Sequence, residues 1–471
     1  MSINVSDIKF RKSVMVNDAS SNGGRKGQVE VVSGVRHNLF PRVTKSERIN
    51  GVTRWRKEFW ANENADDDIG YGMLVYPEYP SNADDRFYIG EGSQIDVQGD
   101  LADYSPILLG VGSLAADITA GDGTVTLLME NNDFRFLNGG VLHLTDKFKT
   151  SQTIAIGVRV GDSVEYSGGE WVKRTASVDI EYPYGLYVGS NKVMTLEATT
   201  KEEWLDIADN AYVGEVIGAG DDTTAPTLST LTNITNGICR QPDSLPEVTA
   251  GAQIVSIDKD GVCSGDCSAG ELNMATGAWT TQITWTSVVA TGTNVTIDYK
   301  ENCFAYTGNQ VVVTLENTVA NSYTAANNNT YGAGCLDGGE ITPSMDSWVE
   351  TSASGTYDES GYPVLMFNDG TEEDDFTLTL TGGGTTFSAA GTNAGAIGSG
   401  TVGVTFSPIN PNTGQPYFTL TGTGWGGTWA DSEKIEFHTD PAAFPIWLKE
   451  VVPALTAQDP DNLFVLGWYA E

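Results

Sequence analysis

Histidine is scarce in this 471-residue sequence and occurs only at His37, His143 and His438. No two of them are close in the chain, so the paired-histidine patterns of zinc hydrolases are absent. The sequence also has no GxSxG nucleophile motif and no GxxxxGK[ST] phosphate loop. We therefore expect a non-enzymatic protein with no catalytic residues, no metal and no cofactor.

The remaining motifs that suggest chemistry are weak. The letters GxGxxG occur at 398–403 and 422–427, but neither precedes an amphipathic helix, as a dinucleotide site requires. His143 lies in an apolar stretch and is expected to be a half-buried sheet residue. His438 is expected to cap a helix together with Asp440. These residues give no sign of a catalytic triad.

Carboxylates are abundant, with 62 Asp and Glu, but their patterns are not specific. The segment 258–261 begins like a calcium loop, yet Val262, Cys263 and Ala269 stand where further ligands are needed. We expect 66–68 and 372–375 to be solvated acidic turns, with loose cation binding as the alternative. A polysaccharide hydrolase with two acidic residues is a further alternative, because the sequence alone does not exclude a suitable pair.

Long apolar runs are absent as well. No run of about 18 apolar residues exists, so no membrane span is expected. The N-terminus lacks the apolar core of a secretory signal, which predicts synthesis and folding in a cytoplasm. The formal net charge of −36 disfavours binding to nucleic acid.

Basic residues are few, 26 in all, and they are unevenly placed. Residues 1–60 contain 12 Lys or Arg and 5 Asp or Glu, a net charge of +7, whereas the remaining residues carry −43. This asymmetry predicts a basic N-terminal arm that docks on an acidic surface of its own or a neighbouring subunit. A solvated N-terminus whose charge has no role is the alternative.

The first 238 residues lack cysteine, and all five cysteines follow within one stretch. An odd number allows at most two intrachain disulfides. The CxxxC spacing at 263–267 has no second pair or nearby histidine, so a zinc site is disfavoured. We expect disulfides or buried thiols at Cys239, Cys263, Cys267, Cys303 and Cys335.

The 54 glycines, with many Asn, Thr and Val, predict many short strands joined by tight turns. The expected fold is mainly β, with multidomain sandwich or barrel modules, an extended N-terminal arm and few short helices. The expected parts are a basic arm (1–65), a β-domain with one short helix (66–220), a Cys-containing sandwich-like module (226–338) and a β-domain with a C-terminal helix and strand (340–471).

Two segments are predicted to be helical. Thr200 and Glu203 have capping-box spacing before a short apolar stripe that ends near Asn210. Asp440 and Pro441 are suited to begin a second helix, which would place Phe444, Trp447 and Val451 on one face and end before Pro453. A terminal apolar strand is predicted to follow over 463–469.

The segments 37–57 and 84–100 carry a recognisable pattern. It reads ERINGVTRWRK at 47–57, then Asp84-Asp85 before a strand, then GSQIDVQGD at 92–100. This pattern, over about residues 35–102, resembles virion-associated structural proteins of tailed bacteriophages, although Ser93 replaces the expected Thr. The resemblance implies membership of the particle in the neck, tail or baseplate region, with other virion proteins and copies of itself as partners and with assembly in the host cytoplasm.

We therefore expect assembly through the arm, and we expect removal of residues 1–60 to leave a folded body. The alternative is a surface or decoration protein that binds a receptor or host glycan, with Trp425 and Trp429 as the residues to test. The expected interface residues are Arg36, Arg42, Lys45, Arg48, Arg54, Trp55, Arg56, Lys57, Phe59 and Trp60.

Overall fold

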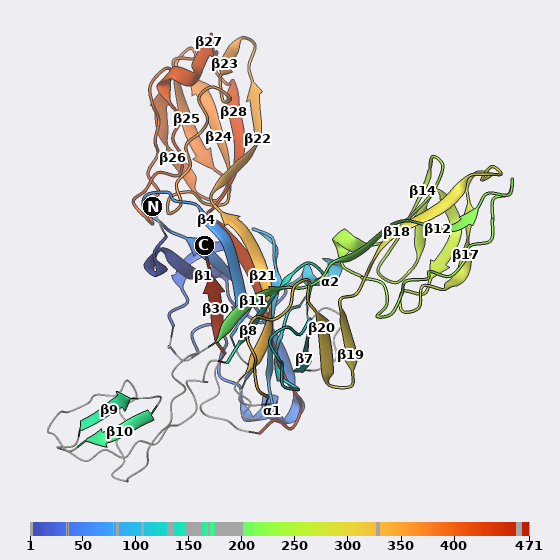
Figure 1. The fold of residues 1–471 in the computed structure, drawn as a ribbon. Coiled ribbons are helices and arrows are strands. Elements are labelled where there is room, and N and C mark those ends of the chain that lie inside the picture. The colour runs from blue at the N-terminus through green and yellow to red at the C-terminus, as the bar shows by residue number, and fades with distance from the viewer. Residues whose placement is uncertain are drawn as a thin grey trace. The chain divides into compact units, whose positions relative to one another are not determined.

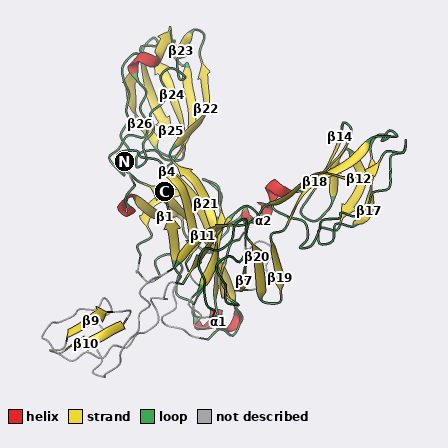
Figure 2. Cartoon of the chain, in the orientation of Figure 1, coloured by secondary structure: helices red, strands yellow, loops and turns green. Residues whose placement is uncertain are grey.

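The computed structural model is mainly β, with several sheets and a few short helices, as the composition predicts (Figures 1 and 2). It describes residues 3–33, 35, 37–78, 80–81, 84–104, 108–129, 136–146, 163–167, 170–174, 201–325, 330–457 and 464–470. Two compact units divide the chain, one formed by residues 1–77, 81–110 and 335–471, the other by residues 78–80 and 111–334. The first unit therefore contains both ends of the chain.

The central sheet of the first unit joins N-terminal and C-terminal segments. Its order is β2 (Gly23–Glu30), β1 (Ile8–Met15), β3 (Val52–Asn62), β29 (Ala443–Val452) and β5 (Arg86–Glu91). Strands β3 and β29 pair antiparallel over ten residues, with Trp60 opposite Phe444 and Arg54 opposite Glu450. The first 65 residues are thus not an extended arm, because β1, β2 and β3 are three of the five strands in this sheet.

Short helices and a second set of strands complete this part of the unit. The helices are η1 (Val5–Asp7), α1 (Lys45–Asn50) and α2 (Leu101–Tyr104). Strand β4 (Gly70–Pro77) pairs with β30 (Leu466–Tyr469) and with the last residues of β21 (Tyr331–Ile341). The terminal apolar strand predicted over 463–469 is therefore observed from Leu466.

A sandwich-like module lies between β21 and β29 in the sequence. Its five-stranded sheet has the order β22 (Ser344–Thr351), β28 (Lys434–Asp440), β24 (Asp374–Thr381), β25 (Thr386–Gly391) and β26 (Gly395–Thr401). Strands β23 (Gly355–Tyr357) and β27 (Trp425–Gly427) form a two-stranded sheet, and η3 (Gly422–Gly424) directly precedes β27. The two sheets share one aromatic core. Ser344 is opposite Asp440, so the module closes where the chain enters and leaves it.

The strands of the second unit have the order β11 (Glu202–Asp206), β8 (Val141–Thr145), the first residues of β21, β6 (Val111–Leu114), β7 (Thr124–Leu128), β20 (Gln310–Thr314) and β19 (Phe304–Thr307). Val125, Leu127, Leu142 and Val313 are among its fully buried core residues. A separate hairpin is formed by β9 (Ser163–Ser167) and β10 (Glu170–Arg174). The strands predicted over 154–160 and 177–182 lie outside the described residues.

A second sandwich-like module is inserted between β11 and β19. Its main sheet has the order β12 (Asn210–Ala219), β18 (Asn294–Glu301), β13 (Glu247–Ala250), β14 (Gln253–Ile257) and β15 (Cys263–Gly265). Strands β16 (Cys267–Leu272) and β17 (Trp279–Trp285) pair separately, and η2 is Pro242–Ser244. Asn210 is opposite Glu301, so this module also closes at its base.

Both segments that were predicted to be helical form strands. The segment expected to be helical from Thr200 to Asn210 contains β11, which pairs with β8, and Glu203 instead accepts hydrogen bonds from the backbone of Ala320 and Asn321. The segment after Asp440 is β29, paired on both sides by β3 and β5. Long-range pairing overrides the local helix signals in both places.

The consecutive domains expected from the sequence differ from this arrangement. The expected boundary between residues 220 and 226 is not observed, since the cysteine-containing module begins at Asn210 and closes near Glu301. The C-terminal module ends at Asp440, and the chain then returns to the N-terminal sheet as β29. A closed barrel, offered as an alternative to a sandwich, is not observed among the described strands.

Candidate functional site

Five of the ten expected interface residues are buried in the core of the first unit. Arg54, Arg56, Lys57, Phe59 and Trp60 are all buried in β3. Phe59 and Trp60 therefore do not form binding hot spots on a free surface. Strands β1 and β29 pair with the two edges of β3, and consecutive buried residues over its last seven positions show that side chains on both faces are packed within the protein.

Lys57 is the centre of a buried polar cluster. Its ammonium lies 2.6 Å from the Asp96 carboxylate and donates to the backbone carbonyls of Gly24 and Asp96 at 2.8 and 3.1 Å. Trp447 donates its indole N–H to the second oxygen of Asp96 at 2.6 Å. Burial lowers the pKa of Lys57, and the hydrogen bond and charge of Asp96 oppose that shift. The cluster joins β3, β29 and the 92–100 loop.

The two buried arginines also have acceptors from this chain. Arg54 lies 2.9 Å from Glu450 and also contacts Glu47. Arg56 pairs with Asp18 at 2.7 Å. The buried arginines are thus paired with carboxylates of the same molecule, of which Asp18 and Glu47 belong to residues 1–60 and Glu450 does not.

A smaller set of the expected residues lies at the surface around α1. Arg42 and Lys45 are exposed, and Arg48 is half-buried beside the Thr456 carbonyl. Ile49 is 49% exposed, Leu455 is 82% exposed, and the Leu455 amide donates to the Ile49 carbonyl. We call Arg42, Lys45, Arg48, Ile49 and Leu455 the α1 surface. It combines positive charge with apolar area.

The other two expected interface residues do not join the α1 surface. Trp55 is half-buried, with its ring edge-on to Trp447 at 6.2 Å and the Lys449 ammonium over its face. Arg36 lies outside the described residues.

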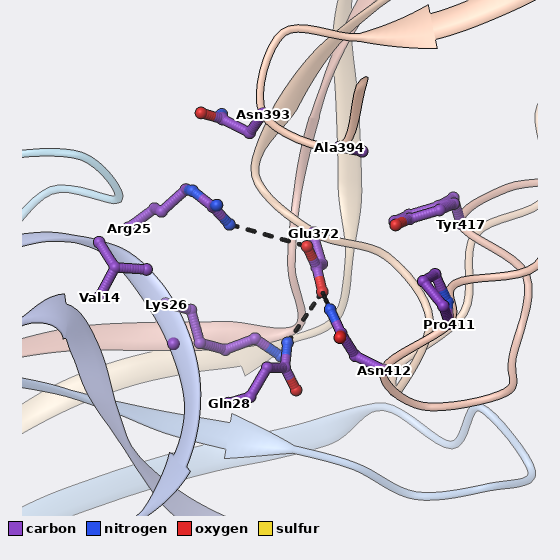
Figure 3. A pocket seen from close by; sticks show the side chains of 11 residues that line it. Val14, Arg25, Lys26, Gln28, Glu372, Asn393, Ala394, Pro411, Asn412 and Tyr417 are labelled. Carbon is purple, nitrogen blue, oxygen red and sulfur yellow. Dashed lines mark hydrogen bonds and ion pairs between the residues drawn. The ribbon is translucent and has the colours of Figure 1, made fainter. Parts of the chain in front are cut away.

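A polar pocket of about 250 Å³ lies in the same unit, between β2 and loops of the C-terminal module. Figure 3 shows Arg25, Lys26 and Gln28 on one side and Asn393, Pro411, Asn412 and Tyr417 on the other, with Glu372 between them. Gln28 and Asn410 donate to one Glu372 oxygen at 2.8 and 2.9 Å. No sequence motif marks this pocket, because Gln28 and Glu372 are 344 positions apart.

The acidic segment 372–375 is not a solvated turn. Glu372, Glu373 and Asp374 are buried, and Asp374 accepts hydrogen bonds from the Asn393 and Ala394 amides. Burial is the main cause of a raised pKa at Glu373. Within the described residues, no group of three or more His, Cys, Asp or Glu is arranged to hold a metal ion.

The two tryptophans expected for glycan binding are part of the C-terminal core. Trp429 is only 4% exposed, and Trp425 packs against it with ring centroids 5.6 Å apart. Trp425 also stacks on Phe387. They therefore stabilise the module and do not form an exposed stacking platform.

Two of the three histidines, His143 and His438, have structural surroundings. His143 is fully buried, rather than half-buried, and lies 2.7 Å from Glu202 and against Trp204. His438 is in β28, not at a helix entry, and lies between Asp375 and Asp440 at 2.9 and 3.4 Å. Burial lowers the pKa of His438, but the hydrogen bond to Asp375 and both acidic neighbours raise it overall.

All five cysteines are in the thiol form, so the disulfide alternative is not observed. Cys239, Cys303 and Cys335 are buried, and Cys263 and Cys267 are partly buried. Burial raises the pKa of Cys263 to about 12, with smaller contributions from Cys267, Asp258 and Glu271. Since the thiolate is the reactive form, these surroundings disfavour nucleophilic chemistry at Cys263.

The comparisons give no relative for this chain: no protein-family model, no curated protein and no solved structure matches it. Among the helices of the described residues, none is both long and apolar enough to cross a membrane.

Proposed function

We propose that this protein is a non-enzymatic structural component of a tailed-bacteriophage particle, in its neck, tail or baseplate region. It acts by binding neighbouring particle proteins, including copies of itself. The proposal starts from the resemblance of residues 35–102 to virion-associated proteins. That resemblance covers two segments that are separate in the sequence. The contact between these segments in the folded protein supports the proposal.

The observation that carries the proposal is the ion pair between Lys57 and Asp96. Lys57 ends the first recognisable segment, and Asp96 lies within the second. Their contact is buried and is extended by the hydrogen bond from Trp447 to Asp96. The pattern therefore corresponds to one packed element, in which residues of both segments depend on each other.

The α1 surface is the part of this element that we assign to assembly. Arg42 and Lys45 are exposed and have no hydrogen bond or ion pair with any other described residue. Ile49 and Leu455 add apolar area beside them. Interfaces of this kind favour an acidic, partly apolar partner, since complementary charge accelerates encounter and suppresses wrong partners. Acidic surfaces are plentiful on this chain, whose net charge is −36.

Charge reversal tests this assignment. A phage lacking the gene is complemented with wild type or with the triple variant R42E/K45E/R48E, and purified particles are quantified by immunoblot. We expect the triple variant to fold but to enter particles at less than a tenth of the wild-type level. The matched control is K259E/K434E, which reverses exposed lysines in the two sandwich-like modules. Wild-type incorporation of the triple variant would remove the α1 surface from the proposal.

A further inference from the structure

The pocket beside β2 has a wall of consecutive polar side chains because the strand is irregular. Arg11 of β1 is opposite Glu30, whereas Ser13 is opposite Lys26, so two residues of β1 span four of β2. A bulge of this type bends a strand and changes the direction of its side chains. Arg25, Lys26 and Gln28 thereby line one cavity instead of alternating strictly across the sheet.

Lys26 is the unusual member of this wall. It is only 7% exposed, yet its ammonium makes no hydrogen bond or ion pair with any part of the chain that the structure describes. Burial lowers the pKa of Lys26, and the charges of Glu63, Glu372 and Asp369 oppose that shift without contacting the ammonium. Lys57, the other deeply buried lysine of the same sheet, has Asp96 and backbone carbonyls as acceptors. A buried cation without an acceptor is costly, so a group that supplies oxygen acceptors would stabilise Lys26.

Glu372 does not supply that acceptor. One of its oxygens accepts from Gln28, Asn410 and Asn412 at 2.8, 2.9 and 3.5 Å. The other oxygen faces the Arg25 guanidinium at 3.7 Å. The pocket lining thus has two cations and one carboxylate whose acceptor capacity is largely used. The groups of β2 in this pocket that can still form hydrogen bonds are donors, on Lys26 and Arg25.

The size of the pocket restricts its occupant. A volume of about 250 Å³ is below the range of roughly 300–1,000 Å³ typical of sites for drug-sized ligands. It accommodates a single small anion or one sugar residue. The side-chain amides of Asn393 and Asn412 on the opposite wall donate to Glu373 and Glu372, so Lys26 and Arg25 are the donors of the lining that we assign to an oxyanion.

We propose that this pocket binds a compact oxyanion through Lys26 and Arg25. The shared chemistry is a group with two or three negatively charged oxygens, either the carboxylate of an acidic sugar or inorganic phosphate or sulfate. Lys26 supplies a buried point charge, and Arg25 supplies a planar pair of donors at the entrance. This binding activity is independent of assembly through the α1 surface.

Isothermal titration of the full-length protein tests the proposal at constant ionic strength. The probes are glucuronate, N-acetylneuraminate, phosphate and sulfate, with glucose as the neutral comparison. We expect saturable one-to-one binding of at least one oxyanion and none of glucose. Preference for the sugar acids would identify a saccharide source, and preference for phosphate or sulfate would identify the inorganic group. Absence of saturable oxyanion binding would overturn the proposal.

Variants separate a specific site from general attraction to basic side chains. K26M should weaken binding by at least tenfold, and R25M should weaken it severalfold even if K26M fails to fold. The control is K9M, a partly exposed lysine of β1 that pairs with Glu30 and does not line the pocket. Equal binding by wild type and both pocket variants, or an equal loss in K9M, would contradict the assignment.

Discussion

At the residue scale, Glu58 is the carboxylate with the most unfavourable surroundings in the N-terminal sheet. It is 1% exposed, and one of its oxygens has no hydrogen-bond partner among the described residues. Burial raises the pKa of Glu58 to about 8, and the charge of Lys12 only partly opposes the shift. This residue therefore holds a proton at neutral pH in the folded protein.

The raised pKa of Glu58 predicts a pH dependence of stability with a definite sign. The unfolded chain releases this proton near pH 4.5 and the folded chain near pH 8, so the folded state binds more protons between these values. The contribution of Glu58 to the free energy of unfolding falls as pH rises through that window and then stays low. The loss is on the order of 5 kcal/mol.

E58Q should remove this penalty. We expect its stabilising effect to be small near pH 5 and to reach several kcal/mol at pH 9, as measured by urea denaturation followed by tryptophan fluorescence. E30Q, which changes a half-exposed carboxylate of β2, is the matched control and should show no such growth with pH. An E58Q effect that is independent of pH would contradict the charged-state argument.

At the element scale, the sequence predicts strands better than it predicts their partners. Apolar patterns and turn residues identify β4, β5, β7 and β8, because each strand contains apolar residues and has a Gly or Asp at or next to at least one of its ends. The apolar spacing in β29 is equally compatible with a helix. Its strand conformation depends on pairing with β3 and β5, which are far from β29 in the sequence.

Helix α1 begins with a local sequence signal that predicts its start. Thr44 and Glu47 have capping-box spacing: the Glu47 amide donates to the Thr44 hydroxyl at 3.3 Å, and the Thr44 amide donates to the Glu47 carboxylate at 2.7 Å. The same capping-box spacing at Thr200 and Glu203 does not produce a helix, because Glu203 lies in β11 and this strand pairs with β8. The pocket around Lys26 had no comparable signal, because its walls come from opposite ends of the sequence.

The structure reverses the expected effect of removing the N-terminal segment. Deletion of residues 1–62 takes away β1, β2 and β3 and uncovers Ile446 and Trp447, which are fully buried in β29. We expect insoluble protein, or soluble protein without a cooperative unfolding transition, in expression and circular dichroism experiments. A soluble, cooperatively folded deletion variant would restore the arm interpretation.

At the scale of the whole molecule, the two sandwich-like modules are insertions with closed bases. Ser344 and Asp440 are cross-strand partners, so their Cα atoms are about 4.5–5.5 Å apart. The module between them has its own core, which includes Phe376, Leu378 and Phe437. Its contacts with β2 are polar, through Gln28, Arg25 and Glu372. It therefore has the features of a separately folding part.

Excision of this module should leave a folded remainder. We expect a chain in which residues 345–439 are replaced by a short glycine linker to stay soluble, and the fragment 342–441 to unfold cooperatively by itself. Calorimetry and circular dichroism of the two proteins measure both outcomes. Failure of the fragment to fold would show that its core depends on the N-terminal sheet.

The cations of the N-terminal region have two separate roles in this account. Buried pairs such as Arg54–Glu450 and Lys57–Asp96 use N-terminal cations to hold the first unit together. The cations left at the α1 surface are few, and the acidic remainder disfavours nonspecific association of copies. We therefore place specificity in a small basic and apolar surface on a strongly acidic protein.

The central claim is membership of a tailed-phage particle, and quantitative mass spectrometry of density-purified particles tests it most directly. The account predicts that this chain is present at a fixed ratio to the major capsid protein in independent preparations and through successive purification steps. Its absence from purified particles, or a ratio that falls with each step, would contradict the account.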